Sequence, residues 1–564
     1  MKCRRNPPPP GRWGAKEQPA LPPMGISCQV QLEDKCTACH APMGHFEHHF
    51  TGQGPYSIAY MEQDDIAFDG VSCVPCHMQK EDSIGKFFSG QLRLDTAGRP
   101  IYGPYATDDI FGAPMEAFVH YVPQYGAHIL DAGLCAGCHS LITETVDLDG
   151  NLTGDEFVEQ ATYHEWNNSS FDNRTHPATG ITCQGCHVPL LDDTVGVVLS
   201  ANYVFLQPKS PFGQHHFAGG NAFMLTMLKD NGDTLRVTAT PDQFDSSIAR
   251  THRMLQQHTL MLETSVPARN ADTAFIDVKL TNLAGHKFPS GFPSRRAWVQ
   301  LIVANANGDT LYNNGAPSAD GDIVGHDPPW EPHYNTITDA GQVQIYEMVM
   351  GDVNGNMTHA LERAKQPLKD NRLVPDGFST AHYAYDTTQI VGGALSDPDF
   401  NHEDGVEGSG TDVLHYHVPM AGYTGLVNIT AKVWYQSVPR RSVQDMFTSS
   451  SPEIDLFKGM FNAADNAPVL VRSASQTDMT TGIDDLRELG VHVFPNPVRD
   501  GVLNITGMDA RVTGIEVYDA GGRKVGGRHG ANGRSWSMRL PGSGTYIVVV
   551  RTAEKSFVER VVSL

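Results

Sequence analysis

The sequence predicts a multidomain protein: a loop-rich, partly helical N-terminal domain, then an all-β Ig-like sandwich and a small C-terminal β-sandwich. Three observations predict this architecture. The chain has 564 residues, enough for several domains of roughly 100–200 residues each. All ten cysteines lie before position 187, in a segment with few long periodic patterns. After that segment the cysteines vanish, and apolar residues alternate with polar ones, which indicates strands.

Shifts in composition predict where the parts begin and end. Residues 1–27 carry Lys2, Arg4 and Arg5 before a proline run, so they do not have the apolar core of a secretory signal. We expect this segment to be disordered or to start at the wrong methionine. The remaining parts are the N-terminal domain, the sandwich, a polar linker and the C-terminal module, over residues 28–263, 264–461, 462–482 and 483–564.

Individual elements follow from periodicity. The clearest helix candidate spans 244–262 and carries His252 and His258. In the sandwich, Ile276, Val278 and Leu280 share one face of a predicted strand, because strand side chains alternate. We expect further strands there at 298–303, which runs toward an Asn-Gly-Asp turn at 307–309, and at 343–349 and 426–435. In the C-terminal module we expect strands at 491–494, 502–505, 515–518, 546–550 and 557–562.

Charge and hydropathy exclude two classes of function. There are 41 basic and 64 acidic residues, a formal net charge of −23, and no basic stripe that could bind phosphates. Nucleic-acid binding is therefore disfavoured. No stretch approaches the roughly 18 consecutive apolar residues of a membrane helix, so we expect no transmembrane segment.

Eight of the ten cysteines belong to four Cys-x-x-Cys-His motifs, the attachment signature of haem c. Two thiols separated by two residues can form thioethers to the two vinyl groups, while the next imidazole binds the iron. The composition predicts only about 0.008 such motifs by chance. The sequence therefore predicts four covalent haems on Cys36 and Cys39, Cys73 and Cys76, Cys135 and Cys138, and Cys183 and Cys186, with proximal ligands His40, His77, His139 and His187. Apolar porphyrins would then supply the core of a tetrahaem domain over 28–263.

Other uses of paired cysteines fit less well. Zinc pairs usually stand roughly 15–20 residues apart, and redox dithiols need no histidine after the second cysteine. Disulfides within the pairs are the third alternative. Cys3 and Cys28 fit no motif, and either a disulfide in an oxidising compartment or no special role remains open for them.

The ligand on the far side of each iron separates an electron carrier from an enzyme, since an iron with two protein ligands has no open position. After the four proximal histidines, 21 of the 25 remain. Methionine ligation has no specific support. The candidates in or near the haem region are His45, His48, His49, His120, His128, His164, His176, His215, His216, His252, His258 and His286.

Several motifs in fixed order give the chain a family resemblance. They include Cys39-His40-Ala41-Pro42-Met43, Gly126-Ala127-His128, Gly219-Gly220-Asn221, Gly285-His286-Lys287-Phe288-Pro289-Ser290-Gly291, Glu331-Pro332-His333-Tyr334 and Lys369-Asp370-Asn371-Arg372. Over roughly residues 36–461 the chain resembles bacterial secreted multihaem cytochromes c, in which a haem domain precedes a β-sandwich. The resemblance implies mainly bis-histidine haems and favours His49, His128 and His215 as distal ligands, with His258 and His286 competing for the fourth. It also implies the hypothesis of a homopolymer, an extracellular cytochrome filament.

The C-terminal segment resembles a type IX secretion sorting domain. Its motifs are Val493-Phe494-Pro495-Asn496-Pro497, Val517-Tyr518-Asp519-Ala520-Gly521-Gly522 and Leu540-Pro541-Gly542-Ser543-Gly544-Thr545-Tyr546. Such tails send proteins across the outer membrane, so the resemblance implies a secreted protein, extracellular or on the outer cell surface.

Two weaker patterns suggest metal sites. Asp147-Leu148-Asp149-Gly150-Asn151 resembles the start of a calcium loop, but Leu152 and Val158 stand where Gly and Glu are needed, so a solvated acidic turn is favoured over calcium. Glu331-Pro332-His333-Tyr334 with Asp322 and Asp327 could bind a metal, yet a loop that latches the sandwich is the favoured interpretation.

Taken together, the patterns predict an electron carrier that passes electrons between a redox partner protein and an extracellular acceptor. The alternative is a multihaem oxidoreductase of a small nitrogen or sulfur compound with one open haem site. Against that alternative, every motif ends in histidine and histidine is abundant. A third interpretation makes the sandwich a binding module that only displays the haems.

Overall fold

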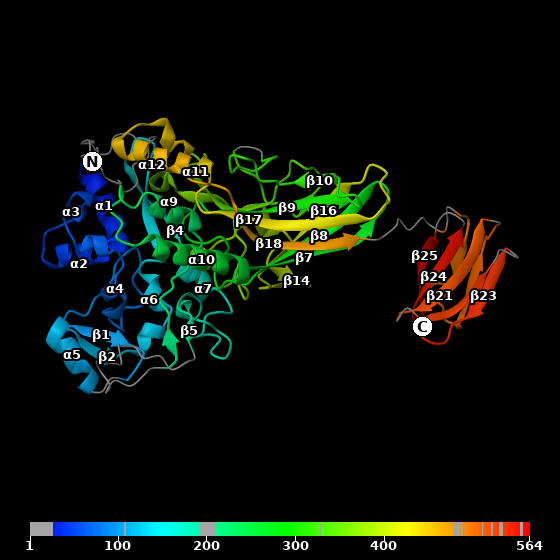
Figure 1. The fold of residues 1–564 in the computed structure, drawn as a ribbon, viewed down its shortest axis with the longest axis horizontal. Coiled ribbons are helices and arrows are strands. Elements are labelled where there is room, and N and C mark those ends of the chain that lie inside the picture. The colour runs from blue at the N-terminus through cyan, green and yellow to red at the C-terminus, as the bar shows by residue number, and fades with distance from the viewer. Residues whose placement is uncertain are drawn as a thin grey trace.

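The computed structural model describes residues 26–106, 109–191, 210–326, 329–478, 486, 489–509, 511–520, 523–529, 534–552 and 556–564. It has three modules in chain order: a mixed N-terminal domain, a large β-sandwich and a small C-terminal β-module (Figure 1). A multidomain, strand-rich architecture is therefore confirmed.

The N-terminal domain consists of short helices and two-stranded sheets (Figure 1). Its apolar clusters are small, such as Ala132, Ala136, Tyr163 and Trp166. The helices are α1 (Ile26–His40), α2 (Pro42–Phe50), α3 (Ile58–Met61), η1 (Ala67–Asp69), α4 (Val74–His77), α5 (Asp109–Val119), η2 (Ala127–Leu130), α6 (Gly133–Ala136), α7 (Thr162–Asn167), α8 (Cys183–His187), α9 (Ala222–Asp230) and α10 (Pro241–Gln257). The strands are β1 (Pro100–Gly103) with β2 (Val122–Tyr125), β3 (Leu141–Val146) with β4 (Leu152–Gln160), and β5 (Leu190–Leu191) with β6 (Phe212–Gly213).

The helix expected over 244–262 exists as α10 but is shifted toward the N-terminus. Thr240 caps it in a reciprocal pair with Gln243, and Pro241 occupies the first turn, where its missing N–H costs nothing. The expected end was wrong because Leu260 and Leu262 belong to a strand. Their side chains are buried in the sandwich core, and pairing with the next strand satisfies their backbone groups. The sandwich therefore begins at 260 rather than 264.

Two sheets form the sandwich. One contains β11 (Thr336–Ile337), β16 (Thr411–Pro419), β8 (Thr273–Asn282) and β7 (Leu260–Arg269), in that order. The other has the order β13 (Gln366–Asp370), β12 (Ile345–Gly351), β9 (Arg296–Asn305), β17 (Val427–Gln436) and β18 (Val469–Asp478), with β10 (Thr310–Asn314) also paired to β9. Outside the two sheets lie β14 (His402–Glu403), β15 (Val406–Glu407), η3 (Leu361–Arg363), η4 (Tyr385–Thr387), η5 (Gly393–Ser396), α11 (Arg440–Gln444), η6 (Met446–Thr448) and α12 (Pro452–Ala463).

The core lies between the two sheets and follows the predicted alternation. In β8, Ile276, Val278 and Leu280 are almost fully buried, whereas Asp277 and Lys279 form ion pairs on the other face. The predicted hairpin is also present, because β9 and β10 pair on either side of the 307–309 turn. The strands expected at 343–349 and 426–435 correspond to β12 and β17.

The linker expected over 462–482 is wrong for most of its length. Residues 469–478 form β18, which pairs along β17 and closes the edge of the larger sheet. Its sequence is polar because one face is exposed, so composition alone resembled a linker. The preceding helix α12 packs against α9 of the N-terminal domain, where Phe461 contacts Phe223 with ring centroids 5.4 Å apart.

The C-terminal module consists of two small sheets (Figure 1). One has the order β19 (His492–Phe494), β20 (Val502–Thr506), β23 (Ser535–Arg539); the other has the order β22 (Lys524–His529), β21 (Val512–Asp519), β24 (Gly544–Thr552), β25 (Ser556–Ser563). The five expected strands are present. Sequence reasoning missed β22 and β23 because glycine and polar residues interrupt their apolar alternation.

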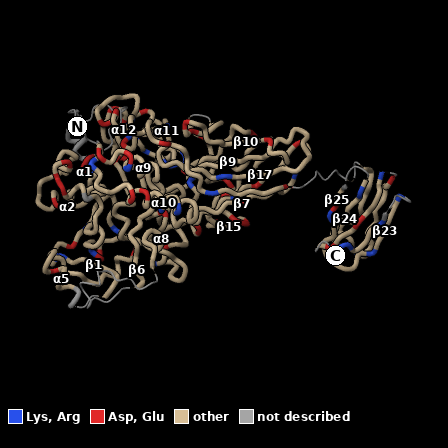
Figure 2. The backbone as a smooth tube through the Cα atoms, viewed as in Figure 1, with Lys and Arg blue, Asp and Glu red and all other residues tan. Residues whose placement is uncertain are grey.

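In the parts of the chain that the structure describes, none of the helices has the length and apolar character needed to span a membrane. Acidic and basic residues are spread along all three modules (Figure 2).

Candidate functional site

Each Cys-x-x-Cys-His motif forms one helical turn. The motifs lie at the end of α1, across α4, from the end of α6 onward and along α8. The helical bond from the His77 N–H to the Cys73 carbonyl is 2.9 Å long, and that from His139 to Cys135 is 3.0 Å. Positions i, i+3 and i+4 share one face of a helix, so both thiols and the imidazole point to the same side. All eight motif cysteines are outside disulfides, as thioether attachment requires.

The first, second and fourth motifs all lie next to the third motif. A hydrogen bond joins the thiols of Cys39 and Cys138 and is the main cause of the raised pKa of Cys39. Another hydrogen bond joins Cys135 to Cys183 and raises the pKa of Cys135. Cys76 of the second motif is also close to Cys135 and Cys138, although burial is the main cause of its raised pKa of about 12. The third motif therefore lies next to the other three.

Two glutamine side chains hold these motifs together. The Gln184 amide, inside the fourth motif, donates to the backbone carbonyls of Ile129 and Asp131 at 3.0 and 2.8 Å, just before the third motif. The Gln79 amide, just after the second motif, donates to the Leu134 carbonyl at 3.1 Å. Amide donors on buried carbonyls satisfy polar groups and fix the separation of the helical turns.

The segment around Gly90 brings the first and third motifs together. The Gly90 N–H donates to the Gly137 carbonyl at 2.7 Å, and its φ of +79° favours glycine. A Cβ at Gly90 would lie 2.5 Å from the Ala38 Cβ and 3.3 Å from the Cys39 sulfur. Glycine is therefore required here both for its backbone conformation and for this close approach.

Two of the predicted proximal histidines are oriented as iron ligands. The Nδ1 atom of His77 lies 2.6 Å from the Tyr102 carbonyl, and that of His187 lies 2.9 Å from the Ala218 carbonyl. A carbonyl can only accept, so Nδ1 carries the proton and Nε2 keeps its lone pair for a metal. Burial lowers the pKa of His187 and lowers that of His139 to about 4, which keeps both rings neutral at pH 7.

The ring of His215, a predicted distal ligand, lies close to the ring of His77. The two ring centroids are 6.2 Å apart, with the rings tilted by 36°. Two imidazoles that bind one metal from opposite sides, each with its nitrogen about 2 Å from the metal, have ring centroids roughly 6 Å apart. The spacing of this pair therefore fits bis-histidine ligation of the second haem.

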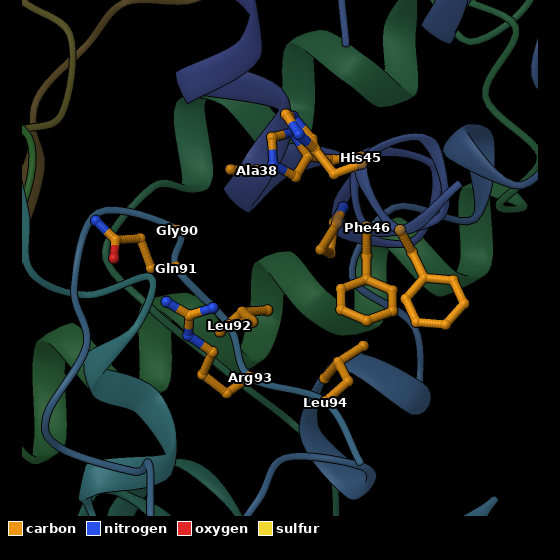
Figure 3. A pocket seen from close by; sticks show the side chains of 11 residues that line it. Ala38, His45, Phe46, Gly90, Gln91, Leu92, Arg93 and Leu94 are labelled. Atoms are coloured by element: carbon orange, nitrogen blue, oxygen red, sulfur yellow. The ribbon is translucent and has the colours of Figure 1, made fainter. Parts of the chain in front are cut away.

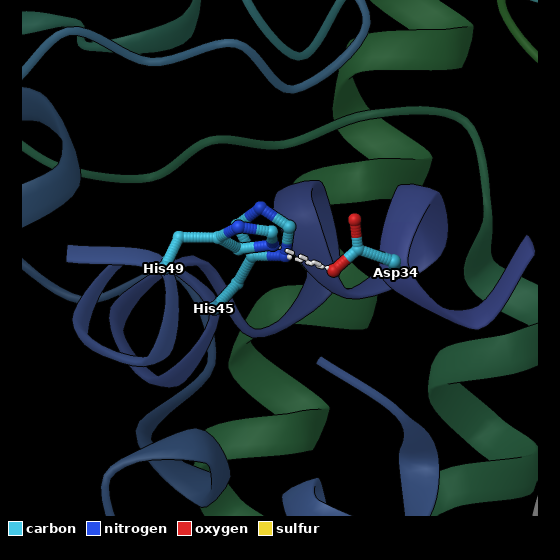
Figure 4. Close-up of side chains that lie close together, drawn as sticks. All are labelled: Asp34, His45 and His49. Carbon is cyan, nitrogen blue, oxygen red and sulfur yellow. Dashed lines mark hydrogen bonds and ion pairs between the residues drawn. The ribbon is translucent and has the colours of Figure 1, made fainter. Parts of the chain in front are cut away.

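A pocket next to the first motif contains the predicted ligand His49. Its wall includes Ala38 of the motif, His45 and His49 from α2, and Leu92, with Arg93 at its edge (Figure 3). The His49 Nε2 lies 2.7 Å from an Asp34 carboxylate oxygen, and both histidines converge on that carboxylate (Figure 4). The apolar wall suits a porphyrin, but the Nε2 of His49 is engaged by Asp34 in this conformation.

His128 is buried between the second and third motifs. Its Nε2 donates to the Gln79 carbonyl at 3.0 Å, and its ring packs edge-on against Tyr102. Its buried Nδ1 has no hydrogen-bond partner. Nδ1 is therefore the ring nitrogen of His128 that is available to bind a metal.

The structure separates the two competitors for the fourth distal position. His258 is exposed at the C-terminal end of α10. His286 lies in the loop between β8 and β9. Its neighbour Gly285 lies against Phe171, which packs with Ala136 of the third motif and Cys183 of the fourth. The Nδ1 of His286 donates to the Lys287 carbonyl at 2.8 Å, which leaves Nε2 with its lone pair. The surroundings of His286, and not those of His258, suit a ligand.

His164 has similar surroundings, although sequence reasoning did not choose it. Its Nδ1 lies 3.1 Å from the Ser140 hydroxyl, directly after the third motif, and its ring packs against Phe88. Burial lowers its pKa, so the ring is neutral. No sequence motif marks His164 as a ligand. Only the fold brings it close to the Cys-x-x-Cys-His motifs.

In the sandwich, His333, Asp397 and Asp412 bring their side-chain nitrogen and oxygen atoms close enough together to bind one metal ion. The Nε2 of buried His333 lies 2.8 Å from an Asp397 oxygen and 4.0 Å from an Asp412 oxygen. However, the amides of Gln344 and Asn371 both donate to the His333 Nδ1. Nδ1 is thus unprotonated, and Nε2 carries the proton that it donates to Asp397. Hydrogen bonding therefore argues against a metal on this ring.

The other weak sequence signals fall in ordinary turns. Asp147 accepts hydrogen bonds from the N–H groups of Asp149 and Asn151, so its carboxylate stabilises the β3–β4 hairpin turn. In the Glu331 loop, Tyr334 donates to the Glu331 carboxylate at 2.6 Å, whereas Asp322 pairs with Arg296. Asp327 and Cys3 lie outside the described residues, and Cys28 lies within α1.

Comparisons with known proteins identify no family. No family model matches the chain, and no curated protein matches it. Among solved structures, the chain is similar to a penta-haem cytochrome c552 from Thermochromatium tepidum, with 16% identity, 78% of this chain and 83% of that chain covered, and a TM-score of 0.43. It is also similar to the sulfur carrier protein SoxY from Chlorobium limicola f thiosulfatophilum, with 17% identity, 13% and 78% covered, and a TM-score of 0.11. At such scores these likenesses carry no argument about function.

Proposed function

We propose that the protein is an electron carrier that holds four c-type haems in its N-terminal domain. The observation that carries this proposal is the convergence of the motifs: the thiol of Cys39 contacts Cys138, and that of Cys135 contacts Cys183. Attachment groups in contact hold neighbouring cofactors close together. When bound, haem c supplies a reversible one-electron iron couple.

The residues of the domain fit this cofactor in four ways. The motif thiols are outside disulfides and lie on the same helical face as their histidines. His77 and His187 keep Nε2 for the metal because backbone carbonyls hold their Nδ1. The spacing of His77 and His215 suits two ligands on one iron. The small apolar clusters of this domain also suit a fold whose core a large apolar cofactor completes.

Distal ligands decide between a carrier and an enzyme. We propose His215 for the second haem and His286, in preference to His258, for the third or fourth. His49 and His128 remain proposals from the family resemblance. Export to the cell surface and the redox partners are proposals that rest on the same sequence resemblances.

The test is to purify the holoprotein, quantify its haem, and record low-temperature paramagnetic resonance. We expect four haems per chain and low-spin signals, because two imidazoles give a strong ligand field. Replacing His215 with Ala should convert one haem to high spin, whereas the exposed His258→Ala serves as the matched control and should change nothing. A high-spin haem in the wild-type protein would favour the oxidoreductase alternative, and fewer than four haems would contradict the proposal.

A further inference from the structure

The loop between β8 and β9 leaves the sandwich and docks on α7 of the N-terminal domain. The Ser290 hydroxyl donates to the Glu165 carboxylate at 2.6 Å and lies 2.8 Å from the Thr162 hydroxyl. The Lys287 N–H donates to the same carboxylate at 3.2 Å. At Gly285, a Cβ would lie 3.0 Å from the Phe171 ring. The two modules therefore meet in a close contact that centres on Glu165.

Behind this contact lies a buried network of four charges: Glu165, Lys287, Asp370 and Arg372. Arg372 lies 3.0 Å from the Glu165 carboxylate and donates two hydrogen bonds to Asp370, at 2.8 and 2.7 Å. Lys287 completes the network with an ion pair of 2.8 Å to Asp370. None of the four side chains is more than 5% exposed.

The network balances two positive and two negative charges across the domain boundary. Desolvation makes such a network a poor source of stability compared with well-packed apolar residues. Its bidentate and ion-pair geometry instead fixes one relative position of the groups that it joins. Because Glu165 belongs to the N-terminal domain and the other three to the sandwich, the network fixes the loop on that domain.

His286 directly precedes Lys287 in this loop. Its Nδ1 donates to the Lys287 carbonyl at 2.8 Å, and its own carbonyl accepts from the Asn282 amide at 2.8 Å. Gly285, the residue before it, lies against Phe171, and Phe171 packs in one cluster with Ala136 of the third motif and Cys183 of the fourth. His286 therefore lies beside these two motifs. Lys287, which the network holds in place, is thus the next residue in the chain after His286, which lies beside the haem motifs.

We propose that Glu165, Lys287, Asp370 and Arg372 are positioning residues that hold His286 of the sandwich in place as a haem ligand. The inference rests on the proposed function and adds that the sandwich is a structural part of the redox centre rather than a display module. In this proposal Glu165 is the residue of the N-terminal domain that holds the loop in one conformation.

The test compares variants of the full-length holoprotein by paramagnetic resonance and optical spectroscopy. His286→Ala should turn one of the four haems high spin, a loss of about one quarter of the low-spin signal. Glu165→Gln should give the same high-spin species in part of the molecules, and added imidazole should restore the low-spin signal in both variants. If added imidazole restores the low-spin signal, the variant has lost the correct placement of a ligand. A loss of stability alone would not be reversed by imidazole.

Glu347→Gln is the matched control. Glu347 is a buried carboxylate of β12 that pairs with Lys369 at 3.4 Å and with Arg441, and it is not one of the four charges of the network. It should lower stability and leave all haems low spin. If Glu165→Gln and Glu347→Gln change the spectrum alike, or if Glu165→Gln leaves the His286-dependent haem low spin, the inference is wrong although the proposed function stands. A wild-type protein without its four haems would instead contradict the proposed function.

Should Glu165→Gln fail to fold, Ser290→Ala provides the second variant. It removes the 2.6 Å hydrogen bond to Glu165 and keeps every charge of the network. We expect a smaller fraction of the same high-spin species, again reversed by imidazole. An unchanged spectrum in this variant would contradict the positioning role.

Discussion

At the scale of single residues, hydrogen bonds assign roles that residue type leaves open. His77, His187 and His286 each donate Nδ1–H to a backbone carbonyl and keep Nε2 for another bond. His333 has the reverse arrangement, since two amides donate to its Nδ1. The same side chain therefore suits a metal in the first three cases and a hydrogen bond to a carboxylate in the last.

Asp412 gives a testable pH dependence beside His333. It is fully buried, accepts a 2.6 Å hydrogen bond from Tyr346, and burial raises its pKa to about 6. A folded-state pKa above the unfolded value of about 3.9 means that the folded state binds the proton more tightly, so this stabilisation is present at low pH and is lost as the pH rises through about 6. Above pH 7 the ionised group then costs about 2–3 kcal/mol.

We therefore expect Asp412→Asn to raise the free energy of unfolding at pH 7.5 by up to about 2 kcal/mol and to change it little at pH 4. Urea denaturation at the two pH values measures the difference. The variant keeps an oxygen acceptor for Tyr346. An equal effect at both pH values would show that the carboxyl does not titrate as inferred.

At the scale of elements, the strand β18 shows how pairing outweighs composition. Its polar sequence resembles a linker, yet it pairs along β17 from Val469 to Asp478. Its last residue, Asp478, also forms an ion pair of 3.2 Å with Arg269 of β7, which is buried. The strand therefore connects the edges of both sheets.

A chain that ends at 461 should consequently fold less stably than one that ends at 478. Without β18, the backbone groups of β17 become an unpaired sheet edge, and Arg269 loses its buried partner. We expect a lower urea midpoint and aggregation on size-exclusion chromatography for the shorter chain, and a single monodisperse species for the longer one. Identical behaviour of the two chains would contradict a structural role for β18.

At the scale of the whole molecule, a net charge of −23 should affect which partners react quickly. The acidic excess attracts cations over distances limited by salt, with a Debye length of about 10 Å at 0.1 M. We expect a cationic complex such as hexaammineruthenium to oxidise or reduce the holoprotein several-fold faster at 10 mM than at 500 mM salt. Stopped-flow measurements against an anionic mediator, for which the trend should reverse, provide the control. Salt-independent rates for both mediators would mean that the net charge does not act at the site of electron exchange.

The sequence by itself determined the features that depend on neighbours along the chain. Two thiols and an imidazole at i, i+3 and i+4 share a helical face, so the haem-attachment motifs are visible without a fold. The core face of β8 is also visible in the sequence, because strict alternation separates Ile276 and Val278 from Asp277. The β9–β10 hairpin is visible because of its short turn.

Only the tertiary structure decided the features that join distant segments. The ring contact of His215 with His77, the packing of Gly285 beside His286 against Phe171, and the strand β18 depend on contacts between residues far apart in sequence. Local periodicity carries no information about such contacts, because burial and pairing energies arise only when the chain brings the partners together. The buried network around Glu165 is the clearest case, since Glu165 lies more than 100 residues from the other three charged residues in sequence and meets them only in the folded chain.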